Sequence, residues 1–128
     1  MKTYARWLFG IAGVFNLVVG GALLFARPWL IAILRLDPAG GSNLVLANLA
    51  GMFVALFGYA YLRIAADPLK YRLYIHLGAA GKLLAVICVI PPWLTGAIPA
   101  TLPVLVTADL VFALLFLDFL RRLAGLPA

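Results

Sequence analysis

Four long, predominantly apolar stretches dominate the sequence and restrict what the chain can fold into. They run approximately over residues 7–25, 44–62, 73–90 and 104–120. A bilayer's hydrocarbon core is about 30 Å thick and a helix rises about 1.5 Å per residue, so each stretch is long enough to cross it. Only 11% of the 128 residues are charged, whereas a soluble domain has roughly a quarter. The sequence therefore predicts one domain, residues 1–128, embedded in a membrane.

Each stretch ends at residues that break a helix or resist entering hydrocarbon, since proline lacks a backbone donor and arginine favours the interface. These boundaries are Arg27-Pro28, Arg63 with Asp67-Pro68, Pro91-Pro92 and Arg121-Arg122. Residues 28–36, PWLIAILRL, are too few to span the bilayer and too apolar for an aqueous loop, which predicts a short interfacial helix. The predicted fold class is all-α: an integral membrane antiparallel four-helix bundle with a short interfacial helix between helices 1 and 2.

Basic residues are distributed unequally between the two ends of the predicted helices. Seven lie at the end with both termini and two at the other: Lys2, Arg6, Arg63, Lys70, Arg72, Arg121 and Arg122, against Arg27 and Arg35. Cytoplasmic loops carry an excess of Lys and Arg, so we expect cytoplasmic termini in a multi-pass protein of the cell (inner or plasma) membrane. Aromatic residues typical of interfaces lie near the same end: Tyr4, Trp7, Tyr59, Tyr61, Tyr71 and Tyr74. This placement explains the net charge of +6 without a nucleic-acid partner.

Two ionisable side chains lie deep within the predicted membrane helices. Lys82 is about 15 Å from the cytoplasmic end of the third helix, and Asp109 is about 18 Å from that end of the fourth. A charge in hydrocarbon costs roughly 2.5–3.5 kcal/mol, so it normally faces protein and has a partner. Because the two helices are joined by a short loop, we predict that Lys82 and Asp109 pair near the middle of the membrane.

Two amide side chains are predicted to join them in one central layer. Asn16 and Asn48 lie about 15 and 22 Å from the cytoplasmic ends of the first and second helices. Small residues at helical spacing flank these positions, which indicates faces where helices approach closely. The stripes are Gly13, Asn16 and Gly20; Asn48, Gly51, Ala55 and Gly58; and Gly78, Lys82 and Ala85. The candidate ligand-binding residues are therefore Asn16, Asn48, Lys82 and Asp109.

His76 and Tyr59 are secondary candidates near the cytoplasmic interface. His76 lies about 120° around its helix from Lys82. Its role is either to form a hydrogen bond at the interface or to transfer protons. Tyr59 is either an interfacial aromatic residue or a gate to the cytoplasmic leaflet. Asp118 precedes Arg122 by four residues, the spacing of a surface ion pair. One histidine and one cysteine are too few for a conventional metal or haem site, and no cofactor is identified.

The central layer is predicted to bind a lipophilic, quinone- or lipid-like ligand, or to carry a proton or ion. One alternative is a membrane enzyme acting on an isoprenoid, sterol-like or quinone substrate, in which Asp109 transfers a proton and Lys82 holds developing charge. Another is a non-catalytic subunit of a larger membrane complex or a homo-oligomer. A further alternative is that the polar layer has no ligand and only fixes the register of the helices.

Four spans, glycine-rich faces, an interfacial segment after the first helix and an arginine-rich C-terminus together cover most of the chain. The stretches that carry these features are GVFNLVVGGALLF, NLAGMFVALFGYAYL, HLGAAGKLLAV and TADLVFALLFLDFLRR. This layout resembles the DoxX-like group of small bacterial membrane proteins. The resemblance implies quinone-linked redox chemistry with a membrane-diffusible ligand and assigns no role to any individual residue.

Overall fold

A computed structural model describes residues 1–126, and helices are the only regular secondary structure in that part of the chain. Its five helices are α1 (Lys2–Phe25), α2 (Arg27–Leu34), α3 (Ser42–Ala66), α4 (Arg72–Leu94) and α5 (Thr101–Ala124). All of them except α2 are long and apolar enough to cross a membrane, which confirms the all-α class. Residues 127 and 128 of the predicted domain lie outside the described part.

The prediction that Pro91-Pro92 ends the third helix is wrong. α4 continues through both prolines to Leu94. The fixed φ of proline is compatible with a helix, and the hydrogen bond that each proline removes is lost only within the last two turns. The chain turns afterwards, where Gly96 has a φ of 80° and Ala97 N donates to the carbonyl oxygen of Pro92 over 2.9 Å. Pro103 lies in the first turn of α5, where a backbone N–H has no intrahelical acceptor.

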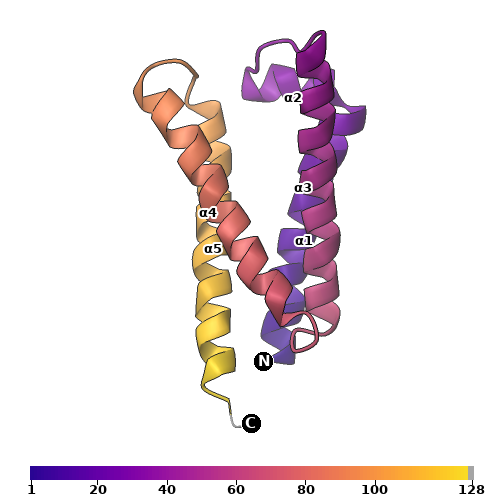
Figure 1. The fold of residues 1–128 in the computed structure, drawn as a ribbon, viewed down its shortest axis with the longest axis vertical. Coiled ribbons are helices and arrows are strands. Elements are labelled where there is room, and N and C mark those ends of the chain that lie inside the picture. Colours follow the sequence, from indigo (N-terminus) through magenta and orange to yellow (C-terminus); the bar gives the residue numbers. More distant parts are fainter. Residues whose placement is uncertain (127–128) are drawn as a thin grey trace.

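The four long helices pack as two pairs rather than as one evenly packed bundle (Figure 1). α1 packs closely on α3, and α4 packs on α5, while contacts between the pairs are much sparser. The pairs meet near the chain termini and diverge towards α2 (Figure 1). We call these two ends of the molecule the termini end and the α2 end.

Glycines allow α1 and α3 to approach backbone to backbone. A Cβ on Gly20 would lie 2.6 Å from the backbone nitrogen of Ala55 and 2.7 Å from the carbonyl oxygen of Gly51. A Cβ on Gly58 would lie 2.9 Å from the carbonyl oxygen of Gly13. The predicted small-residue stripes of the first two membrane helices thus mark a real contact between helices.

The hydrophobic core lies at the termini end, where the two pairs meet. The ring centroid of Phe116 is 4.6 Å from that of Phe9 and 5.2 Å from that of Tyr61. The predicted interfacial position of Tyr61 is wrong, because its side chain is buried in this core. Gly78 makes room for it: a Cβ there would lie 2.6 Å from Cε1 of the tyrosine ring.

Polar groups at the termini end form local pairs. Asp118 accepts hydrogen bonds from Arg121 over 2.9 Å and from Arg122 over 2.8 Å, which confirms the predicted Asp118–Arg122 pair. Between α3 and α4, Arg63 donates to the hydroxyl of Tyr71. That hydrogen bond lowers the pKa of Tyr71 below its usual value.

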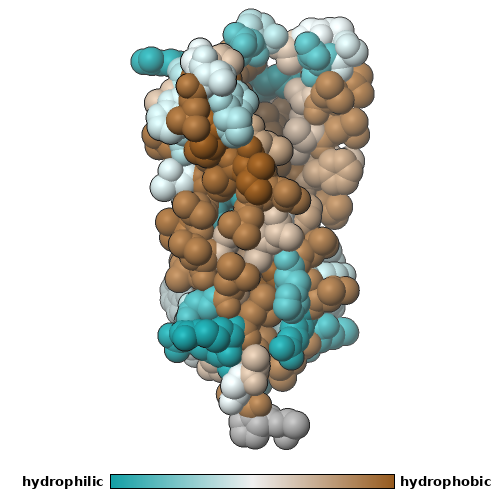
Figure 2. Space-filling view, turned by 60° about the vertical axis from the view of Figure 1, so that its left-hand side comes forward, coloured by the Kyte–Doolittle hydropathy of each residue, from teal (hydrophilic) through white to brown (hydrophobic). Residues whose placement is uncertain are grey.

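On the face shown in Figure 2, a band of hydrophobic residues lies between two hydrophilic ends. Large apolar side chains point outwards along the long helices, among them Val18, Leu56, Leu84 and Leu114. A soluble protein rarely exposes so continuous an apolar surface. The four apolar helices and this surface indicate a small multi-pass membrane protein.

Candidate functional site

Three polar side chains from three helices meet about midway along the molecule. Nζ of Lys82, on α4, donates to Oδ1 of Asp109 on α5 over 2.7 Å and to Oδ1 of Asn16 on α1 over 3.1 Å. Nδ2 of Asn16 donates in turn to the carbonyl oxygen of Val54 on α3 over 3.2 Å. The predicted Lys82–Asp109 pair is present, and these contacts link all four long helices. We call Asn16, Lys82 and Asp109 the polar cluster.

The members of the polar cluster differ in exposure. The side chain of Lys82 is 4% exposed and that of Asp109 is 18% exposed, while Asn16 is 7% exposed. Oδ1 of Asp109 accepts the bond from Lys82, whereas Oδ2 accepts none from residues 1–126. The cluster therefore presents one free acceptor atom, on its most accessible member.

Aromatic rings surround the remaining sides of the ammonium group. Nζ of Lys82 lies 5.5 Å from the ring centroid of Phe15, 5.4 Å from that of Tyr61 and 5.0 Å from that of Phe112. A cation within about 6 Å of a ring centroid is attracted by the negative face of the ring, most strongly where water is excluded. These rings compensate in part for the lost hydration of the buried charge.

The sequence analysis missed these three aromatic residues as site residues, although helical spacing contains a signal for two of them. Phe112 follows Asp109 by three residues, and Tyr61 follows Gly58 by three, so each shares a helix face with a residue already assigned to the interior. Phe15 carries no such signal, because sequence neighbours point about 100° apart around a helix.

An apolar cleft of about 480 Å³ lies beside the polar cluster, between the two helix pairs. Its lining covers parts of residues 15–23 of α1, 50–61 of α3, 81–89 of α4 and 102–109 of α5. The cleft thus extends from the cluster towards the α2 end. Among the described residues, its polar lining side chains are Asn16, Tyr61, Lys82 and Asp109. Small-molecule sites typically combine this size range, about 300–1,000 Å³, with apolar walls and a few polar groups.

Helix α2 lies at the end where the two helix pairs diverge (Figure 1) and is linked to both pairs by hydrogen bonds. The guanidinium of Arg27, at its first turn, donates to Oδ1 of Asn48 on α3. At its other end, the carbonyl oxygen of Leu34 accepts a hydrogen bond from the hydroxyl of Thr101 on α5. α2 is therefore anchored on both sides of the region into which the cleft extends.

The prediction that Asn48 belongs to the central layer is wrong. Asn48 is exposed and bonds to Arg27, so it contacts no member of the polar cluster. The physical reason is depth: Asn48 lies about 22 Å from the termini end of its helix, against about 15 Å for Asn16. That difference exceeds one helical turn of about 5.4 Å.

His76 and Tyr59 also lie away from the polar cluster. Both are exposed near the termini end. Tyr59 lines a separate pocket of about 260 Å³ between α3 and α4, which Tyr74 also lines. The guanidinium carbon of Arg63 lies 5.9 Å from the centroid of the Tyr59 ring. The pocket and the arginine place Tyr59 at the surface between α3 and α4.

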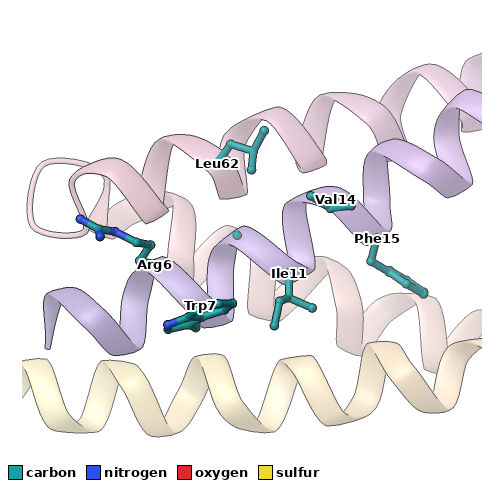
Figure 3. A pocket seen from close by; sticks show the side chains of 7 residues that line it. Arg6, Trp7, Ile11, Val14, Phe15 and Leu62 are labelled. Carbon is teal, nitrogen blue, oxygen red and sulfur yellow. The ribbon is translucent and has the colours of Figure 1, made fainter.

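A groove of about 650 Å³ runs along the outer face of α1 (Figure 3). Trp7, Ile11 and Val14 form its walls and are more than half exposed, and Gly10 leaves a notch between them. Arg6, at the termini end, supplies its one charged lining group. The groove lacks convergent polar groups, so the cleft is the stronger candidate for a specific site.

Comparison with known proteins leaves the chemistry to be inferred from the cleft itself. No protein-family model, curated protein or solved structure matches the chain. The cleft combines apolar walls from four helices with an ion pair of no net charge at one end. Such an arrangement can hold an apolar body along its length and orient a polar group at the cluster.

Proposed function

We propose that this chain is an antiparallel four-helix bundle of the cell (inner or plasma) membrane whose cleft binds a lipophilic molecule with a polar head group. The supporting observation is the polar cluster at one end of an otherwise apolar cleft. A quinone- or lipid-like molecule would lie against the apolar walls and place its head beside Asp109. Membership of the DoxX-like group is part of the proposal, and it makes a quinone one ligand to test.

The packing on the two sides of the cluster favours binding over conduction of protons or ions. A path for charge needs water or polar groups on both sides of the cluster. Towards the termini end, the interior is filled by core side chains such as Phe9, Ile64 and Phe116. The cleft extends only towards the α2 end. The cleft also favours a binding protein over a purely structural subunit, whose interior we would expect to be filled.

Filling the cleft should remove the ligand, and one residue of α4 makes this test specific. Ala85 lines the cleft, whereas its neighbour Leu84 is 58% exposed on the outer face. We expect Ala85→Phe to abolish a molecule that copurifies with the wild-type protein, because the larger ring occupies its space. Leu84→Phe should retain it. Native mass spectrometry of gently extracted protein measures the occupancy.

Thermal unfolding of both variants is the control, since a misfolded Ala85→Phe protein would also lose its ligand. The proposal is contradicted if stable Ala85→Phe and Leu84→Phe proteins carry the same molecule at the same occupancy. It is also contradicted if the wild-type protein carries only detergent and bulk phospholipid and binds no added lipophile.

The orientation of the chain is a separate prediction from the seven-to-two distribution of basic residues. In a Cys88→Ala background, cysteines at Thr3 and Leu69 should react with an impermeant reagent only from the cytoplasmic side. A cysteine at Ala97 should react only from outside. All three positions are exposed and uncharged, so the substitutions leave the charge pattern intact. Labelling of the Leu69 site from outside would contradict the four-span topology.

A further inference from the structure

The ammonium group of Lys82 offers little to a ligand. It carries three N–H donors, of which one bonds to Asp109 and one to Asn16. Three aromatic rings lie 5.0–5.5 Å from the nitrogen. With its side chain 4% exposed, the ammonium is enclosed by the protein on all these sides. Lys82 lines the cleft, but with two of its three donors already bonded it offers a ligand less than Asp109 does.

Asp109 is the opposite case, because it lines the cleft with spare acceptor capacity. An ionised carboxylate has about four acceptor positions on its two oxygens. Oδ1 receives one hydrogen bond from Lys82, and Oδ2 receives none from residues 1–126. A carboxylate oxygen in apolar surroundings is costly without a donor. The chemistry missing from the cleft is thus a hydrogen-bond donor at Oδ2.

The charge of the cluster restricts the ligand further. The ammonium of Lys82 and the carboxylate of Asp109, 2.7 Å apart, cancel to no net charge. An anionic head group would add a second negative charge beside Asp109, and a cationic one would add a second positive charge near Lys82. In a low-dielectric cleft either addition is strongly unfavourable. A suitable head group is therefore uncharged.

We infer that the cleft binds a neutral apolar alcohol whose hydroxyl donates a hydrogen bond to Oδ2 of Asp109. Isoprenoid alcohols, sterol-like alcohols and quinols share this chemistry, whereas quinones, ethers and esters offer acceptors only. The inference rests on the proposed function of the cleft and adds the class of head group to it. For a redox lipid, the inference predicts that the reduced quinol, which bears hydroxyl groups, binds more tightly than the oxidised quinone.

Three probes with the same apolar tail test this assignment: farnesol, its methyl ether and its monophosphate. The affinity of each for the detergent-solubilised full chain is measured by equilibrium dialysis, with the Ala85→Phe protein as the background for micelle partition. We expect farnesol to bind about tenfold or more tightly than the ether or the monophosphate, because only farnesol supplies a neutral donor to a charged acceptor. In the Lys82→Met/Asp109→Leu protein, the preference for farnesol over the ether should disappear.

Each other outcome has a distinct meaning. If the ether binds wild type as tightly as farnesol and both lose affinity in Ala85→Phe, the cleft binds lipophiles but the alcohol assignment is overturned. Tightest binding of the monophosphate overturns the assignment in the same way. If no probe binds wild type above the Ala85→Phe background, the alcohol assignment is overturned, and the copurification experiment decides the proposed function separately.

Discussion

Replacing Asp109 with leucine should destabilise the protein more than replacing Lys82 with methionine, and replacing both should cost less than the sum of the two. Each single change leaves one buried charge without its partner, which typically costs about 3–5 kcal/mol. The ammonium left by Asp109→Leu is the more deeply buried, with its side chain 4% exposed against 18% for Asp109. The double change removes both charges and keeps apolar volume, so much of the stability should return.

Unfolding in detergent of the wild type, both single variants and the double variant measures the coupling between the two residues. The Asp118–Arg122 pair is the control, because its side chains are more exposed, 27% for Asp118 and 54% for Arg122, and exposed pairs contribute only about 0.2–1 kcal/mol. Additive losses at Lys82 and Asp109 would show that the two charges do not interact. The polar cluster would then lose its basis as a site.

Adding one methyl group to Gly20 should destabilise the protein, while adding it to Gly21 should not. A Cβ on Gly20 would lie 2.6 and 2.7 Å from backbone atoms of α3, whereas one on Gly21 would have no such neighbour within 4 Å. Backbone atoms can give way only if α1 and α3 separate, so we expect Gly20→Ala to cost about 1–3 kcal/mol. Gly21→Ala should be neutral or stabilising by up to about 1 kcal/mol, because alanine favours the helix over glycine.

The measurement is thermal unfolding of the two variants in the same detergent, and opposite signs are the expected result. Gly20 and Gly21 are adjacent on one helix, so differences in propensity or insertion cancel in the comparison. Equal effects at both positions would mean that α1 and α3 are not packed through Gly20. The two-pair arrangement would then need revision.

Depth within the membrane is the property that could be read most directly from the sequence. A helix rises a constant 1.5 Å or so per residue, so counting from the charged ends brings Lys82 and Asp109 to similar levels. The same count separates Asn48 from Asn16 by more than one turn, and the structure places Asn48 beside Arg27 instead. The prediction for Asn48 was wrong because it assigned two residues at different depths, Asn16 and Asn48, to the same layer.

Helix ends were less predictable, because they depend on which local signal dominates. Asp67-Pro68 does follow the end of α3 at Ala66. Pro91-Pro92 does not end α4, which runs on to Leu94. Proline can lie inside a helix at the cost of one backbone hydrogen bond, so its presence does not by itself mark the helix end. The residues alone do not show how near that end is.

By itself, the sequence determined that the chain forms four long apolar helices and a short one, with one ion pair deep inside. Only the tertiary structure decided that the helices pack as two pairs, that a cleft lies between them and that Tyr61 turns inwards. In a soluble protein the apolar face of a helix marks its buried side. In a membrane helix every face is apolar, so hydrophobicity does not distinguish protein from lipid. The shapes of facing side chains, such as Gly78 beneath Tyr61, make that choice.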